Sequence, residues 1–215
     1  AENVLEEVLR EAIDSLVASD ARGPRYARSR DLQALRHDHE RRRRACAEMG
    51  DLRMLSVLSG VSGDGSAFEA IGVKQRNMVF CEVCDHACQF LRNRFPEAKV
   101  IPGDIRDPHV RQDVLKACAV LGGIDIAIAG IPCQPSSGAA TVHNTDDPRL
   151  MVGQIAVELL CAAAPKMVII EDVVGFRTNQ KAAFDKVVKT LKGAFDHVAV
   201  ETLGAFHCML PQRRN

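Results

Sequence analysis

One cysteine stands where a buried strand gives way to a loop. The apolar run over residues 124–130 predicts a strand, which leads directly to Pro132 and Cys133. Active sites of α/β proteins lie at the carboxyl ends of their strands, so we interpret Cys133 as a nucleophile. Pro132 and Gln134 hold the surrounding backbone in a loop, and the small hydroxylated residues that follow, Ser137 among them, suit close approach to a phosphate or a base.

A carboxylate is expected at the same edge of the sheet. Residues 167–170 form a second apolar strand pattern, which ends at Glu171. A thiol and a carboxylate that meet in this way favour nucleophilic addition assisted by proton transfer. The alternative for any cysteine near a strand is a buried, inert side chain, and this is our interpretation of Cys118 and Cys161.

Several segments match motifs of one enzyme family. Residues 132–134 read proline-cysteine-glutamine and residues 171–173 read glutamate-aspartate-valine, which resembles the proline-cysteine-glutamine and glutamate-asparagine-valine motifs of the cytosine carbon-5 methyltransferases. The resemblance extends over most of the chain, from about Met54 to Asn215. The other matching segments follow in the family's order, and they are the glycine-rich stretch 58–72, Glu82, Asp104-Ile105, Asp147-Pro148-Arg149 and Pro211-Gln212-Arg213-Arg214.

Helical stretches alternate with short apolar runs from Leu52 onward, which predicts βαβ units and a parallel sheet. The expected strands are 54–58, 78–81, 99–101, 124–129, 167–170 and 198–202, and the expected helices are 65–71, 85–94, 108–120, 150–164 and 180–195. The resemblance implies an α/β, Rossmann-like fold of the S-adenosylmethionine-dependent methyltransferases. In that fold helices cover both faces of a mostly parallel, twisted sheet.

Residues 1–50 differ in composition from the rest. Apolar residues recur at helical spacing over 4–16, and residues 21–44 are rich in arginine, with a second helix expected from Asp31 to Gly50. We therefore divide the chain into a helical extension, 1–50, and a catalytic domain, 51–215. The arginine block 41–44 contacts phosphates, acts as an import signal, or is a solvated helix face, and His37 and His39 are interpreted as surface residues.

Overall composition leaves the partner open. With 28 basic and 28 acidic residues the chain has no net preference for nucleic acid, so any such preference must be local. The eight cysteines, with no leader and no apolar run near ~18 residues, predict a reduced intracellular protein without a membrane span, nuclear in a eukaryote. The spacing of Cys81, Cys84 and Cys88 suggests a metal but lacks a clear fourth ligand, so no metal is expected.

The cofactor is predicted from the first two strand ends. The glycine segment alone favours a structural turn, and Glu82 stands where an α/β nucleotide site binds ribose hydroxyls, so a nicotinamide enzyme would look similar. The resemblance points instead to S-adenosylmethionine, with adenine bound by Asp104 through an acceptor and by Ile105 through an apolar contact. The cofactor-binding residues that it implies are Leu58, Ser59, Gly60, Gly63, Glu82, Val83, Asp104, Ile105 and Pro132.

The resemblance also implies a mechanism on DNA. Cys133 adds to carbon 6 of a cytosine that has rotated out of the duplex, and Glu171 hydrogen-bonds the exocyclic amine and ring nitrogen 3. A methyl group then moves to carbon 5. Arg214 would position the base or its phosphate, and Gln134, Ser137 and Gln212 would lie on the substrate side.

Departures from the family pattern leave alternatives open. Asp172 replaces the family's asparagine, Leu58 a phenylalanine, Ser62 a glycine and Ser136 an aromatic residue. The family's target-recognition region and closing segments would follow Asn215, so we expect a fragment that binds cofactor weakly and methylates poorly when isolated. The other two interpretations are an RNA methyltransferase of the same chemistry and a non-catalytic scaffold that keeps the cofactor fold.

Overall fold

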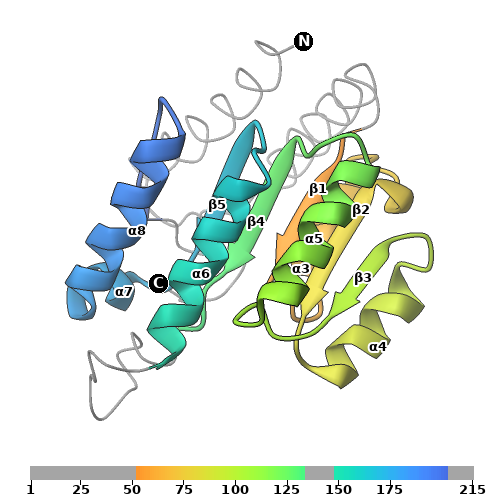
Figure 1. The fold of residues 1–215 in the computed structure, drawn as a ribbon, viewed down its shortest axis with the longest axis horizontal. Helices are drawn as coiled ribbons and strands as arrows, with labels where there is room; N and C mark the ends of the chain where they lie inside the picture. Colours follow the sequence, from red (N-terminus) through yellow and green to blue (C-terminus); the bar gives the residue numbers. More distant parts are fainter. Residues whose placement is uncertain (1–51, 134–147, 203–215) are drawn as a thin grey trace, which may run out of the picture. The chain divides into compact units, whose positions relative to one another are not determined.

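The computed structural model describes residues 52–133 and 148–202 (Figure 1). One compact unit contains Leu52–Glu69 and Lys74–Ala199. Its strands are β1 (Met54–Val57), β2 (Met78–Glu82), β3 (Lys99–Pro102), β4 (Ile126–Gly130) and β5 (Met167–Glu171). The helices are α3 (Gly63–Ala70), α4 (Asp85–Arg94), α5 (Pro108–Val120), α6 (Pro148–Ala162), α7 (Val174–Asn179) and α8 (Lys181–Ala194), with a short 3-10 helix, η1 (Gln75–Asn77).

All neighbouring strands of the sheet run parallel, in the order β3-β2-β1-β4-β5. The chain moves outward from β1 through β2 to β3 and then returns to place β4 on the other side of β1. The reversal of strand order lies between β1 and β4. In open α/β sheets ligands bind at the carboxyl edge beside such a switch point, so the topology selects one edge of this sheet.

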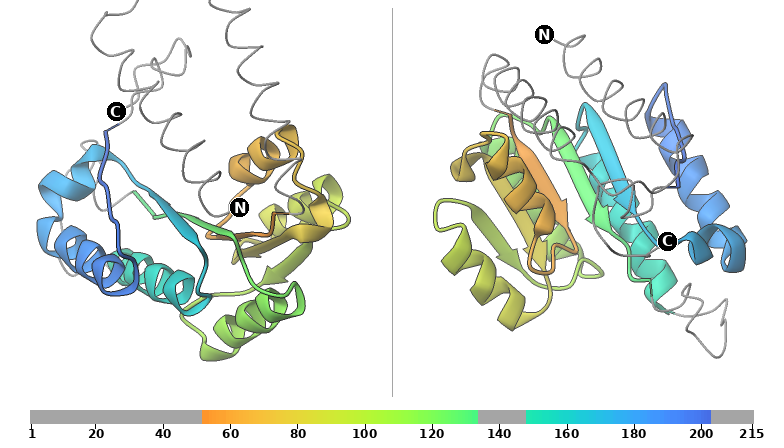
Figure 2. Two further views of the ribbon diagram at one scale, coloured as in Figure 1. Left: turned by 90° about the horizontal axis from the view of Figure 1, so that it is seen from above. Right: turned by 180° about the vertical axis from the view of Figure 1, so that it is seen from behind.

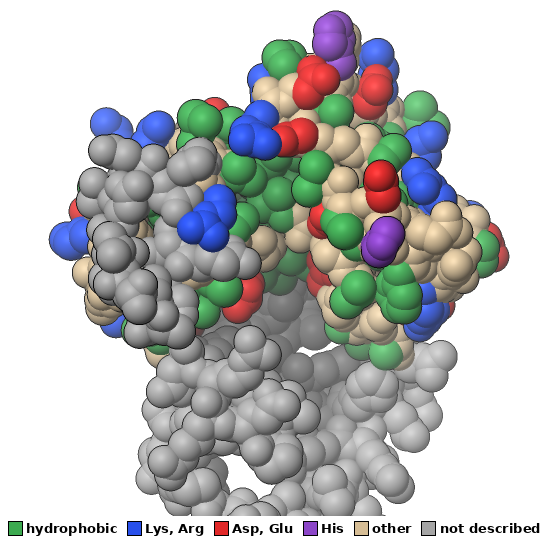
Figure 3. Space-filling model, turned by 90° about the horizontal axis from the view of Figure 1, so that it is seen from below, with side chains coloured by type: hydrophobic (Ala, Val, Ile, Leu, Met, Phe, Trp, Pro, Cys, Tyr) green, Lys and Arg blue, Asp and Glu red, His purple; other side chains and the backbone are tan. Residues whose placement is uncertain are grey.

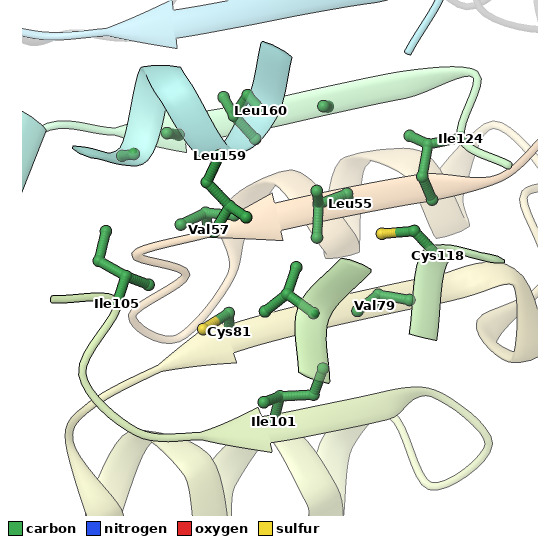
Figure 4. Close-up of a cluster of buried hydrophobic side chains, with 14 residues drawn as sticks. Leu55, Val57, Val79, Cys81, Ile101, Ile105, Cys118, Ile124, Leu159 and Leu160 are labelled. Carbon is green, nitrogen blue, oxygen red and sulfur yellow. The ribbon is translucent and has the colours of Figure 1, made fainter. Parts of the chain in front are cut away.

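Residues alternate between the two faces of the sheet, and each face has its own helices. On one face Leu55, Val79 and Cys81 pack with Val114 and Cys118 of α5 in a cluster that also includes residues of α6 (Figure 4). These side chains are nearly all fully buried, so they form the main core.

The opposite face is built around Phe80. Its ring lies 5.1 Å from the ring of Phe95, which follows α4, and a Cβ at Gly65 of α3 would lie 2.8 Å from the same ring. The glycine therefore lets α3 approach β2 closely. Helices cover both faces of the sheet, as predicted, and Figure 2 shows α3 and α5 on opposite sides of it.

A second apolar cluster joins the last helices to β4. Ile131, Val157 of α6, Phe176 of α7 and Val187 of α8 are buried together. Gln154 of α6 adds a polar link, because its side-chain amide donates to Thr190 of α8 at 3.0 Å. The loop that leaves β4 is thereby packed against the helical layer.

A charged cluster closes the amino edge of the sheet. Arg53 donates from Nε and from its backbone nitrogen to Oδ2 of Asp125, both at 2.9 Å, and Lys166 lies 3.1 Å from Oδ1. Burial alone would raise the pKa of Asp125, but the hydrogen bonds from Arg53 and Lys166 outweigh it and lower that pKa to about 2. These three charged residues directly precede β1, β4 and β5, so their ion pairs connect the starts of the three strands.

One predicted strand is wrong. Residues 198–202 form no ladder with another strand of the described residues, and Val200 is exposed. The alternation of Val198 and Val200 satisfies the sequence pattern of a strand, whereas a strand exists only when its backbone groups pair. The predicted helix 180–195 corresponds to α8, while α7 was missed. The predicted helices of residues 1–50 lie outside the described residues.

Candidate active site

The first loop of the carboxyl edge is strained. Leu58, Gly60 and Ser62 adopt left-handed backbone conformations, with φ of 58°, 53° and 50°. Two of these residues carry a Cβ, and a branched residue such as Leu58 enters this region only at a cost of about 1–2 kcal/mol. Such strain persists only where the surrounding structure enforces it, and strained residues of this kind cluster at functional sites.

Hydrogen bonds to β2 enforce this conformation. The backbone nitrogen and the hydroxyl of Ser59 both donate to the carbonyl of Cys81 at 3.2 Å, and the hydroxyl also reaches the carbonyl of Ser56 at 2.9 Å. Gly63 then opens α3, and nothing lies within 4 Å of the place where its Cβ would be. The loop therefore presents backbone rather than side chains at this point.

Glu82 ties the first two strand ends together. Its carboxylate accepts hydrogen bonds from the backbone nitrogens of Gly60 at 2.7 Å and of Val83 and Cys84 at 2.9 Å. An ionised carboxylate has about four acceptor sites, so three amides leave roughly one for a ligand. Glu82 is only 9% exposed, so its carboxylate is largely shielded from solvent.

The third strand end carries Asp104, and Arg106 holds it. The backbone nitrogen of Arg106 donates to Oδ1 at 2.8 Å and its Nε donates to Oδ2 at 2.8 Å. The hydrogen bond from the guanidinium outweighs burial and lowers the pKa of Asp104. Ile105 is 2% exposed and belongs to the main core, so its side chain packs inward instead of standing open at the edge.

Apolar surface accompanies these polar groups. Val83, directly after Glu82, is 58% exposed, and Val61 in the first loop is also exposed. Figure 3 looks from below Figure 1 toward the edge at which the strands end, and hydrophobic side chains gather in the middle of this view between flanks that carry charges. Such an arrangement suits a ligand with a flat apolar ring and polar ends.

Cys133 and Glu171 lie beyond adjacent strand ends. Gly130 and Glu171 are register partners, and the backbone nitrogen of Ile131 donates to the carbonyl of Glu171 at 2.9 Å. Cys133 follows two residues later and is partly exposed, as is Pro132, while the side chain of Glu171 is exposed. Neighbouring strands lie about 4.8 Å apart, so this pairing brings the thiol-bearing loop and the carboxylate to one place.

The neighbour of Glu171 is unusual. Asp172 accepts a hydrogen bond from the backbone nitrogen of Val173 on Oδ1 at 2.7 Å, but its Oδ2 is buried and has no partner among the described residues. Burial raises the pKa of Asp172 to about 6, against the opposing effect of the Val173 amide and with a further contribution from the charge of Glu171. Two carboxyl groups thus stand at the end of β5 in different environments.

Three of the other described cysteines are buried. Burial raises the pKa of the Cys81 thiol to about 12 and that of Cys118 to about 11, which makes them poor nucleophiles. Cys88 is fully buried and its thiol lies 3.2 Å from the carbonyl of Glu82. Within the described ranges no three His, Cys, Asp or Glu residues are grouped so as to hold a metal ion, and no helix is long and apolar enough to cross a membrane.

Four predicted site residues cannot be placed, since Gln134, Ser137, Gln212 and Arg214 lie outside the described residues. Two residues that shape the site were not predicted from the sequence. Arg106 covers Asp104, and Gly153 of α6 lies so close to Ile131 that a Cβ there would be 2.7 Å from its Cγ2. A glycine inside a helical pattern was the available signal for the second.

Comparisons with known proteins agree on one family. The model of the C-5 cytosine-specific DNA methylases matches residues 52–215. The type II methyltransferase M.AquIA of Picosynechococcus sp. is 34% identical over 124 residues, which cover 57% of this chain and 49% of that protein. M.NgoMIV of Neisseria gonorrhoeae, another type II methyltransferase, is 31% identical over 121 residues, which cover 56% of this chain and 35% of that protein.

A solved structure of a DNMT2 mutant from Spodoptera frugiperda matches with a TM-score of 0.44 and 18% identity, covering 67% of this chain and 41% of the other. The matches to the two type II methyltransferases span half or less of those proteins' lengths.

Proposed function

The chain belongs to the C-5 cytosine-specific DNA methylase family, and from that premise we propose that it transfers a methyl group from S-adenosylmethionine to carbon 5 of cytosine in DNA. The observation that supports this most is the convergence of Cys133 and Glu171 on neighbouring strand ends, beside the switch point of a parallel sheet. A thiol and a carboxylate are the two groups that such a reaction requires.

Carbon 5 of cytosine is a weak nucleophile. The thiolate of Cys133 forms a bond to carbon 6, which pushes electron density to carbon 5 and toward ring nitrogen 3. Glu171 hydrogen-bonds ring nitrogen 3 and the exocyclic amine, and so stabilises the charge that develops there. After methylation a base removes the proton from carbon 5, and the bond between sulfur and carbon 6 breaks to release Cys133.

The residues of the first three strand ends fit the cofactor. Glu82 keeps roughly one acceptor for a ribose hydroxyl, and the exposed side chain of Val83 offers an apolar surface for adenine. Leu58, Ser59, Gly60 and Gly63 supply a loop in which backbone can approach a ligand, and Asp104, Ile105 and Pro132 complete the proposed set. When bound, S-adenosylmethionine supplies an electrophilic methyl group on a sulfonium.

DNA is the proposed substrate because the family and the two relatives are described as DNA methylases or type II methyltransferases. The target carbon lies inside the duplex stack, so the cytosine must rotate out of it before Cys133 can reach the ring. The residues proposed for the substrate side are Gln134, Ser137, Gln212 and Arg214.

Methyl transfer from labelled cofactor tests the proposal. The chain in excess over a cytosine-containing duplex is expected to convert cytosine to 5-methylcytosine, identified after digestion to nucleosides, and Cys133→Ser should abolish the product. Cys161→Ser serves as the matched control, since Cys161 is a partly buried cysteine on α6 and should leave the yield unchanged. Product on transfer RNA but none on DNA would overturn the substrate, and product with Cys133→Ser would overturn the mechanism.

A further inference from the structure

Asp172 combines a partnered oxygen with a buried, unpartnered one. Oδ1 accepts the backbone N–H of Val173, the residue before α7, whereas Oδ2 has no hydrogen-bond donor among the described residues. A buried carboxylate oxygen that is ionised and without a donor is costly. A proton on Oδ2 lowers that cost, because the acid is then neutral.

The surroundings favour the neutral acid. Glu171, directly before Asp172, is the charged group that acts on it, and its negative charge opposes ionisation. The end of β4 beside this turn, Gly130 and Ile131, carries no charge. Arg177 of α7 is exposed and gives Asp172 no hydrogen bond. Burial and the adjacent carboxylate act in the same direction, and the pKa of Asp172 is raised to about 6.

We propose that Asp172 acts in its carboxylic acid form as a positioning residue, which holds the turn between β5 and α7 and so keeps Glu171 oriented toward the substrate base. The inference rests on the proposed function of Glu171. In this form Asp172 presents one acceptor and one donor, as an asparagine does, and adds no second negative charge beside Glu171. Ionisation removes the donor and introduces that charge, which disturbs the base-binding geometry.

In the Asp172→Asn variant the side-chain amide provides a hydrogen-bond donor at every pH. The rate of single-turnover methyl transfer is measured from pH 5.5 to 8.0 in both proteins, and the ratio of the variant to the original chain is followed as a function of pH. We expect a ratio near one at the low end, rising to on the order of tenfold or more at pH 8.0 because little acid remains there. Asp113→Asn, an exposed carboxylate on α5 paired with Lys116, should follow the original chain at every pH.

Thermal unfolding of the same proteins gives a readout that does not depend on activity. A carboxyl whose pKa is raised by folding stabilises the fold in its protonated form, and this contribution is lost as pH rises through about 6. Asp172→Asn should therefore gain in unfolding temperature relative to the original chain between pH 5 and pH 8.

The two readouts separate the possible failures. A rate ratio that stays flat with pH overturns the positioning role, whether or not the unfolding temperatures diverge. Diverging unfolding temperatures with no methyl transfer by any protein would overturn the proposed function itself, while the protonation of Asp172 would stand. Equal pH dependence of unfolding in both proteins would overturn the protonation.

Discussion

Single side chains at the carboxyl edge are held mainly by the backbone. The carboxylate of Glu82 gathers the amides of Gly60, Val83 and Cys84, and Ser59 turns the first loop onto β2. These contacts fix two strand ends. Asp104 differs, because its Oδ2 is held by the side chain of Arg106, which a ligand can displace.

Arg106→Gln should tighten the binding of S-adenosylmethionine. The side chains of Asp104 and Arg106 are 33% and 53% exposed, so their ion pair is weak, and releasing Asp104 should raise affinity by less than about fivefold. Isothermal titration of the cofactor measures the change. Lys116→Gln removes a comparably exposed cation from α5 and should have no effect. Weaker binding by Arg106→Gln would mean that the arginine itself contacts the cofactor.

Sequence patterns that reflect burial predicted strands correctly, whereas a pattern whose strand would need a neighbouring strand to pair with did not. Strands β1, β2 and β4 were predicted within a few residues because they are almost fully buried, which gives continuous apolar runs. Strands β3 and β5 are only partly buried, but their short apolar runs were enough to predict them. The segment 198–202 carries a similar pattern but pairs with no described strand. The placement of Cys133 and Glu171 at the same edge of the sheet was predictable, because β4 and β5 are parallel neighbours. The hydrogen bond from the side chain of Arg106 to Asp104 could not be predicted, because it depends on the side-chain rotamer of Arg106.

Close packing between α6 and β4 explains how the loop that carries Cys133 is positioned. Gly153 allows α6 to approach Ile131, two residues before Cys133, and a Cβ there would be 2.7 Å from the side chain of Ile131. Contact at that distance must displace either the helix or the loop. The position of Cys133 therefore depends on a residue that touches no substrate.

Gly153→Ala should slow methyl transfer by on the order of tenfold or more through displacement of this loop. The unfolding free energy should fall by about 1–3 kcal/mol. Gly193→Ala is the matched control, because nothing lies within 4 Å of its added Cβ in α8. That change should stabilise the helix by about 0.5–1 kcal/mol and leave the rate unchanged. Equal rates for both variants, with the fold intact by circular dichroism, would remove the positioning role of Gly153.

For the molecule as a whole, the two edges of the sheet have different tasks. The carboxyl edge carries strained loops, exposed apolar side chains and carboxylates with spare acceptors. At the amino edge, Asp125 is paired with Arg53 and Lys166 and is 6% exposed. The ion pairs that stabilise the amino edge allow the carboxyl edge to keep strained backbone conformations.

Asp125→Asn should destabilise the fold by about 2–4 kcal/mol at pH 7, since it leaves Arg53 and Lys166 without their carboxylate. The pKa of Asp125 is depressed to about 2, so its contribution is present above the ordinary value near 3.8 and is lost as pH falls through about 2. Denaturant unfolding at pH 7 and pH 3 should show a smaller difference at the lower pH. Asp113→Asn, at an exposed pair, should cost less than about 1 kcal/mol. An equal loss of unfolding free energy at pH 3 and pH 7 in Asp125→Asn would contradict the stabilising role of the ionised carboxylate.

Cys133 is expected to become covalently attached to cytosine during the reaction. The most direct measurement combines the chain with S-adenosylmethionine and a duplex that contains 5-fluorocytosine, from which carbon 5 cannot lose its substituent, so the sulfur bond persists. Mass spectrometry of the digested complex should find the modified base on the peptide that contains Cys133. A base attached to a different cysteine, or no attachment while 5-methylcytosine forms on the ordinary duplex, would contradict the claim.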